Sequence, residues 1–274
     1  MQEDLRNAMM AIRGIKIPEF PKEVTELDAE IKSRFASAQK IVAIIERNTT
    51  ISGEVIRLAN LPVMKAATPV KTIREAVSVM GLSNLYNLVV IAAFKRMFSG
   101  TGLHRDISDH SVDVAFCMAI LSESVAEVTR DEAYLVGLFH NAGSLMLASK
   151  DEDAYSKLFR SGLSNPVKVL EQEEAVFNTN HAMVGLLVGK KWQLPTYMLN
   201  VILLHHSSKV SRISDDKVRT FVAMLKVANA LVAEISLGAY IGEEMQHFLQ
   251  DGVEELMLDS ADLTELRNHL LTEG

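Results

Sequence analysis

Apolar residues recur every three or four positions along almost the whole chain, and this spacing is typical of helices that bury one face. No segment alternates apolar and polar residues over the length that a half-buried strand requires. Clusters of Asp and Asn, rather than linkers rich in Pro or Gly, separate the apolar segments. We therefore predict an all-α protein built of many helices.

Local signals place the ends of several of these helices. We expect helices at residues 36–47, 52–60, 72–81, 83–97 and 217–237, and then a final amphipathic pair that ends near residue 271. Ser52 is the expected N-cap of the second helix. Thr72 and Glu75 have the spacing of a capping box, and Gly81 is expected to end the helix that they begin.

A polar stretch with two glycines at residues 99–109 predicts a junction between subdomains. We expect an N-terminal helical lobe at residues 1–100, a helical core at residues 101–238 and a C-terminal helical extension at residues 239–274. Two hypotheses remain for this extension: its helices cap the core, or they form the surface of a homodimer. The apolar residues concerned are Phe248, Leu256, Leu263, Leu266 and Leu270.

The charge balance and the single cysteine exclude several classes of function. With 28 Lys and Arg against 35 Asp and Glu, the net charge is −7, which argues against broad nucleic-acid binding because that affinity comes mostly from basic side chains. Cys117 is alone, so an intrachain disulfide and a cysteine-based zinc site are excluded, and its apolar neighbours predict a buried thiol. Acidic residues near the N-terminus and the lack of an apolar run of ~20 residues predict a cytoplasmic protein without a secretory signal or membrane span.

Five histidines and two asparagines interrupt helix faces that are otherwise apolar and directed at the core. These residues are His110, His140, Asn141, His181, His205, His206 and Asn229. A single histidine of this kind is ordinarily a core residue that is hydrogen-bonded to a backbone carbonyl, because burying an imidazole without a partner costs about 1–3 kcal/mol. Five on separate faces instead predict that the imidazoles partner one another or an ion. Glu171, Glu173 and Glu174 are expected to form a solvated face, or to contribute a replacement ligand.

The dipeptide His140-Asn141 decides what chemistry such a site could perform. A His-Asp pair at this point would present an imidazole and a carboxylate to a dinuclear metal centre, whereas Asn141 offers only a neutral carbonyl oxygen. The same holds for Asn229. Loss of both carboxylates would remove the anionic ligands and the polarisation of a metal-bound water. We therefore predict a vestigial metal site with no catalytic residue and no required cofactor, able to take up adventitious zinc, nickel or iron.

Six runs of sequence, from IPEFPKEV onward, are similar to those of a known family, and three of them carry the five histidines. These three are DHSVDVAFCMAILSE, AYLVGLFHNAGSLMLA and NTNHAMVGLLVGKKWQLPTYMLNVILLHH. Through the six runs the chain resembles the HD superfamily, and more closely its HDOD branch, the HD-related output domains of bacterial signalling proteins. The resemblance covers about residues 17–229. It implies an N-terminal helical lobe packed on an HD-like helical core.

The resemblance also assigns roles to the histidines. It implies that His110 is the first ligand, His140 the histidine of the His-Asp pair and His181 the next ligand. It matches His205 and His206 to the paired histidines of the family. Asn229 falls near the last aspartate of catalytic relatives such as the HD-GYP phosphodiesterases.

The departures from the family pattern favour a regulatory role. Asn141 and Asn229 stand where catalytic relatives carry acids, and the Gly-Tyr-Pro motif is absent. HDOD domains are generally regarded as lacking phosphohydrolase activity, so the resemblance implies a non-catalytic module that acts through contacts with signalling proteins. Two alternatives stay open: a metal-dependent phosphohydrolase of nucleotides or cyclic dinucleotides, and a nucleotide sensor without turnover.

Overall fold

The computed structural model describes residues 2–98 and 100–273, and within these residues it contains helices and no strands, which confirms the all-α prediction. The helices are α1 (Gln2–Ala11), α2 (Lys22–Ile31), α3 (Ala38–Glu46), α4 (Thr49–Ala59), η1 (Pro62–Met64), α5 (Ile73–Met97), α6 (Leu103–Leu121), α7 (Arg130–Phe139), α8 (Ala142–Lys150), α9 (Glu152–Gly162), α10 (Lys168–Phe177), α11 (His181–Lys191), α12 (Thr196–Leu204), η2 (Val210–Arg212), α13 (Asp216–Ile235), α14 (Glu243–Leu256) and α15 (Ser260–Glu273).

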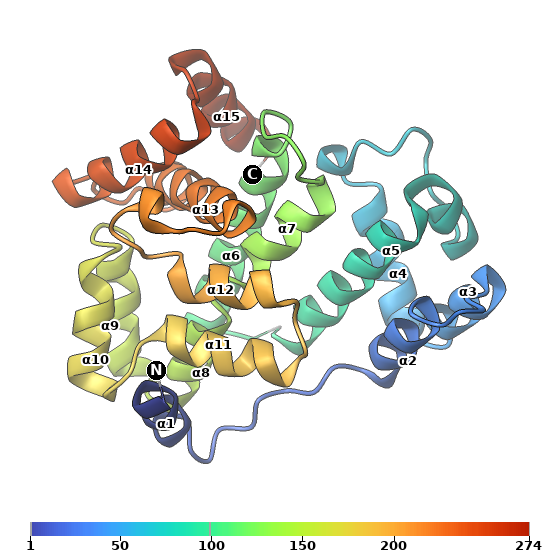
Figure 1. Cartoon of the computed structure of the whole chain (residues 1–274), viewed down its shortest axis with the longest axis horizontal. Helices are drawn as coiled ribbons and strands as arrows, with labels where there is room; N and C mark the ends of the chain where they lie inside the picture. Colours follow the sequence, from blue (N-terminus) through green and yellow to red (C-terminus); the bar gives the residue numbers. More distant parts are fainter. Residues whose placement is uncertain (1, 99, 274) are drawn as a thin grey trace.

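Helix α5 connects two groups of helices in space. On one side it packs against α2, α3 and α4, and on the other it packs against α7 (Figure 1). Helix α1 lies apart from α2, at the end of a long connecting segment, and packs against α11. The first helix of the chain therefore contacts the group of helices that carries the histidines.

Two of the predicted helix boundaries are confirmed and one is wrong. Thr72 caps α5 by accepting a hydrogen bond from the backbone N–H of Glu75 at 3.1 Å. Gly81 interrupts α5 with φ 78° and ψ 172°, a left-handed conformation that favours glycine. Ser52 is not an N-cap. Asn48 caps α4 instead: it lies four residues earlier, next to the free amides of the first turn, and its side chain accepts a hydrogen bond from the N–H of Ile51.

The predicted junction at residues 99–109 is shorter than expected. Ser99 lies outside the described residues, and α6 already begins at Leu103. Leu103 and Ile107 are buried one turn apart, so the polar residues between them occupy the exposed side of a helix. The division into lobe, core and extension stays a prediction.

By length and composition, α5 is the one helix among the described residues that could cross a membrane. Core helices of soluble proteins pass the same test. Residues 88–94 of α5 are all buried within the chain, and the helix is broken at Gly81.

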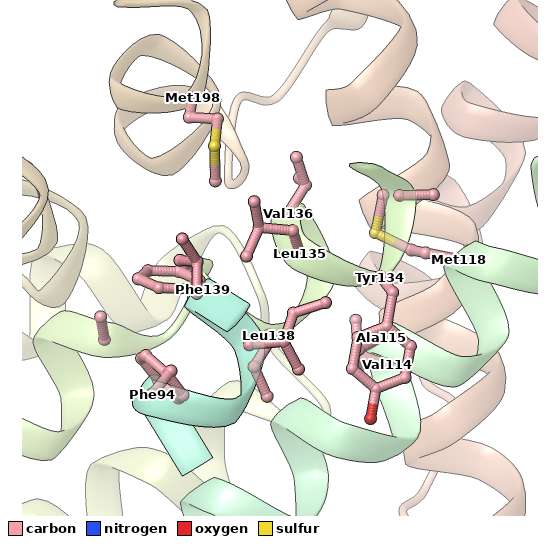
Figure 2. Packing of buried hydrophobic residues seen from close by; sticks show 14 of the residues in the cluster. Phe94, Val114, Ala115, Met118, Tyr134, Leu135, Val136, Leu138, Phe139 and Met198 are labelled. Atoms are coloured by element: carbon pink, nitrogen blue, oxygen red, sulfur yellow. The ribbon is translucent and has the colours of Figure 1, made fainter. Parts of the chain in front are cut away.

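The centre of the fold lies where α6 and α7 cross. Val114 and Ala115 of α6 face Tyr134 and Leu138 of α7, as Figure 2 shows. The backbones approach closely at Gly137, where an added Cβ would lie 2.5 Å from the Cα of Ala115. Cys117 is buried in α6, and burial raises the pKa of its thiol to about 12, in agreement with the predicted buried thiol.

The C-terminal helices cover the core within the same chain. Helix α14 packs on α13, and α15 packs on α6 and α13. Phe248, Leu266 and Leu270 are buried by these contacts, while Leu256 and Leu263 are partly buried against the core. Of the two hypotheses for the extension, the structure therefore supports capping of the core.

Candidate functional site

Six helices bring the seven predicted residues to one buried place. His110 comes from α6, His140 and Asn141 from the turn between α7 and α8, His181 from the start of α11, His205 and His206 from the end of α12, and Asn229 from α13. A cavity with about 40 Å³ of space for water-sized occupants is lined by five of them, which are His110, Asn141, His181, His206 and Asn229. The structure thus brings together all seven residues that were predicted, from the apolar faces of their helices, to be directed at the core.

The imidazole rings form a continuous series. The ring centroid of His140 lies 5.9 Å from that of His110 and 5.3 Å from that of His205. His205 in turn lies 5.2 Å from His181 and 4.1 Å from His206. The prediction that the buried histidines partner one another therefore agrees with the structure.

Backbone carbonyls fix the orientation of two rings. Nδ1 of His140 donates to the carbonyl oxygen of Gly137 at 2.5 Å, and Nδ1 of His205 donates to that of Ile202 at 2.7 Å. In the neutral imidazole the other nitrogen, Nε2, then carries a lone pair. Burial lowers the pKa of both rings well below the ordinary value and keeps them neutral. Nε2 of His140 is buried and has no hydrogen-bond partner among the described residues.

A buried carboxylate fixes a third ring. Glu173 of α10 is 1% exposed, and its two oxygens lie 2.9 and 2.8 Å from Nδ1 of His181. It also accepts from the backbone N–H of His181 at 2.7 Å and from the hydroxyl of Tyr155 at 2.8 Å. Nε2 of His181 is thereby directed away from Glu173, to within 3.2 Å of Nε2 of His205 and 2.9 Å of Nε2 of His206.

The expectation of a solvated acidic face was wrong for Glu173. Glu171 and Glu174 are exposed, but Glu173 lies on the stripe of α10 that contains the buried Val169 and the half-buried Phe177. These three residues are four apart in sequence, so their spacing was the signal that could have revealed the buried carboxylate.

Asn229 lines the cavity, and both polar groups of its side chain have partners within the protein. Its amide Nδ2 donates to the carbonyl oxygen of Leu225 at 2.9 Å, and its Oδ1 lies 3.0 Å from Nε2 of His110. His110 must therefore donate from Nε2, which leaves its buried Nδ1 as an acceptor with no partner among the described residues. Burial lowers the pKa of His110 to about 4, so this ring too is neutral.

The donor atoms fit one borderline ion better than a pair of hard cations. One ligand atom from each of His181, His205 and His206 lies within 4.8 Å of the others. Two nitrogens bound to the same tetrahedral zinc ion lie roughly 3.3 Å apart, given Zn–N bonds of about 2.0–2.1 Å. Nε2 of His181 lies 3.2 Å from Nε2 of His205 and 2.9 Å from Nε2 of His206, and these two separations are close to that value. Nitrogen ligands suit zinc, nickel or iron.

A dinuclear hydrolytic centre does not fit these residues. Among the described residues, Glu173 is the only acidic one that lines the cavity, and both of its oxygens are engaged by His181 and Tyr155. Asn141 and Asn229 are neutral, and the oxygen of Asn229 already faces His110. Hard cations need anionic oxygen ligands, which this cavity does not offer them.

The fold and the site define a class of protein: an all-helical protein with a buried cavity that histidines line. The family model described as the HDOD domain matches residues 17–208, which is most of the chain. This chain belongs to the HDOD domain family.

Known proteins agree with this assignment at the level of the fold. An HDOD domain protein of unknown function from Geobacter sulfurreducens is 19% identical, with a TM-score of 0.70 over 98% of this chain and 97% of the other. A protein from Shewanella amazonensis, provisionally named a phosphohydrolase, is 19% identical, with a TM-score of 0.68 over 96% and 93% of the two chains.

A longer relative comes from the curated proteins. An uncharacterized protein of Treponema pallidum is 24% identical over 205 residues, which make up 73% of this chain. The match covers 39% of that protein, so the relative extends well beyond the matched segment.

Proposed function

We propose that this chain is a non-catalytic signal-transduction module that acts through protein contacts and retains a degenerate metal site. The observation that carries the proposal is the state of Glu173, the single acidic residue in the part of the cavity lining that the structure describes. Its oxygens accept from His181 and Tyr155, so no carboxylate is left to hold a catalytic cation. The site keeps nitrogen donors for one ion and lacks what hydrolysis requires.

The missing carboxylates matter because of the charge that phosphoryl chemistry must stabilise. Hydrolysis of a phosphodiester needs metal charge held in place and a metal-bound water that loses a proton near neutral pH. Neutral imidazoles can hold a borderline ion, but they do not offset the charge of two cations. Asn141 supports the same conclusion, because it lines the cavity with an amide at the position expected for an acid.

The hydrolase alternative rests on the provisional name of the Shewanella structure. Under this alternative the substrates would be nucleotides or cyclic dinucleotides. The cavity argues against it, and against a nucleotide sensor, because its water-accessible space of about 40 Å³ is small for a nucleotide. Either alternative needs the segments that cover the cavity to move.

Metal analysis combined with a hydrolysis assay tests the proposal. We expect the purified protein to hold no more than one transition-metal ion per chain and to leave cyclic dinucleotides and generic phosphodiesters intact with added manganese, iron or zinc. Robust hydrolysis that is abolished by His140→Ala would overturn the proposal.

The Asn141→Asp, Asn229→Asp double variant tests the reason for the proposed inactivity. Because it returns two carboxylates to the cavity, we expect it to bind manganese or iron more tightly than the wild type. Equal affinity would mean that missing carboxylates do not limit metal binding.

The partners in this proposal are other signalling proteins of the cytoplasm. Co-purification of the tagged full chain from its own cells, followed by mass spectrometry, would identify them. A His181→Ala variant in parallel would show whether the histidine cavity influences which proteins are captured. Size-exclusion chromatography of the full chain tests the remaining expectation of a homodimer.

A further inference from the structure

We propose that Glu173 is a positioning residue that holds His181 ready for a borderline transition-metal ion such as zinc. The inference rests on the proposed function only in taking the degenerate site to bind one ion through imidazole nitrogens. It concerns the carboxylate that lies against Nδ1 of His181, on the side of the ring opposite Nε2.

Glu173 is held more firmly than a packing role requires. Its carboxylate receives the hydroxyl of Tyr155, the backbone N–H of His181 and the Nδ1 of the same histidine, all within 2.9 Å. The hydroxyl of Tyr155 also lies 2.8 Å from the hydroxyl oxygen of Ser144. One hydroxyl hydrogen serves one acceptor, so Tyr155 donates to Glu173 and accepts from Ser144.

These contacts link four consecutive helices behind the site. Ser144 lies on α8, Tyr155 on α9, Glu173 on α10 and His181 on α11. Glu173 accepts hydrogen bonds from both the backbone N–H and the ring Nδ1 of His181. The ring therefore cannot rotate or exchange its tautomer without breaking a buried hydrogen bond. The Nε2 lone pair therefore stays directed at His205 and His206.

The carboxylate also changes the electronic character of the ligand. A negatively charged group that accepts a hydrogen bond from Nδ1–H raises the basicity of Nε2. Mutation of such partners typically lowers metal affinity by about 10–100-fold. His205 has only the neutral carbonyl of Ile202 behind it. Of the described residues that line the cavity, Glu173 is thus the one whose negative charge can stabilise a bound cation.

A purely structural reading of Glu173 makes a different prediction. If the carboxylate only joins α10 to α11, its loss lowers stability and leaves the metal affinity of the folded protein unchanged. Affinity measured on folded protein separates the two readings, and hydrolytic activity plays no part in the measurement.

The experiment is a zinc competition against a chromophoric chelator, with metal-free wild type, Glu173→Gln and Glu174→Gln. Glu174 is the matched control, since it is exposed and its Oε1 accepts a hydrogen bond from Nδ2 of Asn180 at 2.7 Å. We expect Glu173→Gln to weaken zinc binding about 10–100-fold and Glu174→Gln to leave it unchanged. Circular dichroism of the same samples verifies that each variant is folded.

A double-mutant cycle tests whether Glu173 acts through His181. In a His181→Ala background, Glu173→Gln should have no further effect on zinc affinity. If Glu173→Gln does not fold, Glu173→Asp, which keeps the charge but draws it back by one methylene, should weaken binding in the same direction.

Equal zinc affinity of Glu173→Gln and the wild type would overturn the inference, and so would a wild type that binds no zinc. Neither result bears on catalysis, which the hydrolysis assay decides separately.

Discussion

Buried, uncharged imidazoles make the protein sensitive to acid at the level of single residues. Burial is the main cause that lowers the pKa of His110 to about 4 and those of His140, His205 and His206 well below the ordinary value. In the unfolded chain these rings take up protons near pH 6.5. Between about pH 6.5 and pH 4 the unfolded state therefore binds more protons than the folded state, and stability falls as the pH falls.

We predict that the free energy of unfolding of the metal-free protein is lower at pH 5 than at pH 7. His110 alone should contribute on the order of 2 kcal/mol to this difference, at about 1.4 kcal/mol for each pH unit between 6.5, where the unfolded ring takes up its proton, and 5. Urea unfolding at the two pH values measures it. His110→Gln should reduce the difference by about that amount, whereas His247→Gln, on the exposed side of α14, should not. A His110→Gln protein with the wild-type pH dependence would contradict the prediction.

The sequence predicted the inward direction of the histidines better than the role of Glu173. A three-to-four-residue stripe belongs to a single helix, so the burial of His110 or His181 could be inferred from the residues on either side. The partners of Glu173 come from α9 and α11, and only the packing of those helices brings Tyr155 and His181 to it. The same limit explains why the hydrogen bond between His110 and Asn229 was not foreseen.

At the level of helices, local capping signals were informative where one side chain had no competitor. Thr72 and Gly81 are placed as predicted. Asn48 and Ser52 compete for the start of α4, and the structure gives the cap to Asn48. The hydroxyl of Ser52 instead lies 2.9 Å from the carbonyl oxygen of Ile45 and 3.1 Å from that of Asn48, and its one hydrogen bond to either of them ties Ser52 to the backbone before α4.

The crossing of α8 and α11 gives a second prediction, at the level of helix packing. A Cβ at Gly143 would lie 1.9 Å from the carbonyl oxygen of His181 and 2.5 Å from the N of Gly185, so no side chain fits. Gly143→Ala should lower the free energy of unfolding by about 3 kcal/mol or prevent folding. Thermal or urea unfolding measures the effect.

Gly53 is the matched control for this substitution. It lies exposed within α4, and a Cβ there would meet nothing within 4 Å. Gly53→Ala should stabilise the protein by roughly 0.5–1 kcal/mol, because alanine has the higher helix propensity. Similar losses in both variants would mean that close approach at Gly143 is not the cause.

At the level of the whole molecule, α14 covers the histidine cavity from outside the segment that matches the family. Met245 lines the cavity, and the ring of Phe248 lies 6.2 Å from that of His206. Asp251 accepts from the N–H of Val210 and pairs at 2.6 Å with Lys226, which is fully buried. These residues lie on one face of α14. This helix therefore contacts the cavity, the ring of His206 and the segment after α12.

Glu244 fastens this cover to the other side of the cavity. Its Oε1 accepts from the N–H groups of Val167 and Lys168 at 2.8 and 3.1 Å, and so caps α10, which has no side-chain cap of its own. Pro166, next to these amides, lines the cavity. The carboxylate of Glu244 thus connects the start of α14 to the loop before α10, at the edge of the cavity.

We predict that Glu244→Ala loosens the cover without altering the histidines. Because a helix cap contributes about 1 kcal/mol, hydrogen exchange at the amides of Val167 and Lys168 should become about fivefold faster. Hydrogen exchange followed by mass spectrometry measures this. Glu243→Ala removes an exposed acid from the same first turn of α14 and should leave these amides unchanged. Equal rates in the two variants would exclude Glu244 as the fastening.

The histidines and the helix that covers them lie in different parts of the sequence. The five histidines precede residue 208, where the family match ends, whereas Met245, Phe248 and Glu244 follow it. The donor set and the element that limits access to it are therefore encoded in separate stretches of the gene. A substitution in the downstream stretch therefore changes the cover of the cavity and leaves all five histidines in place.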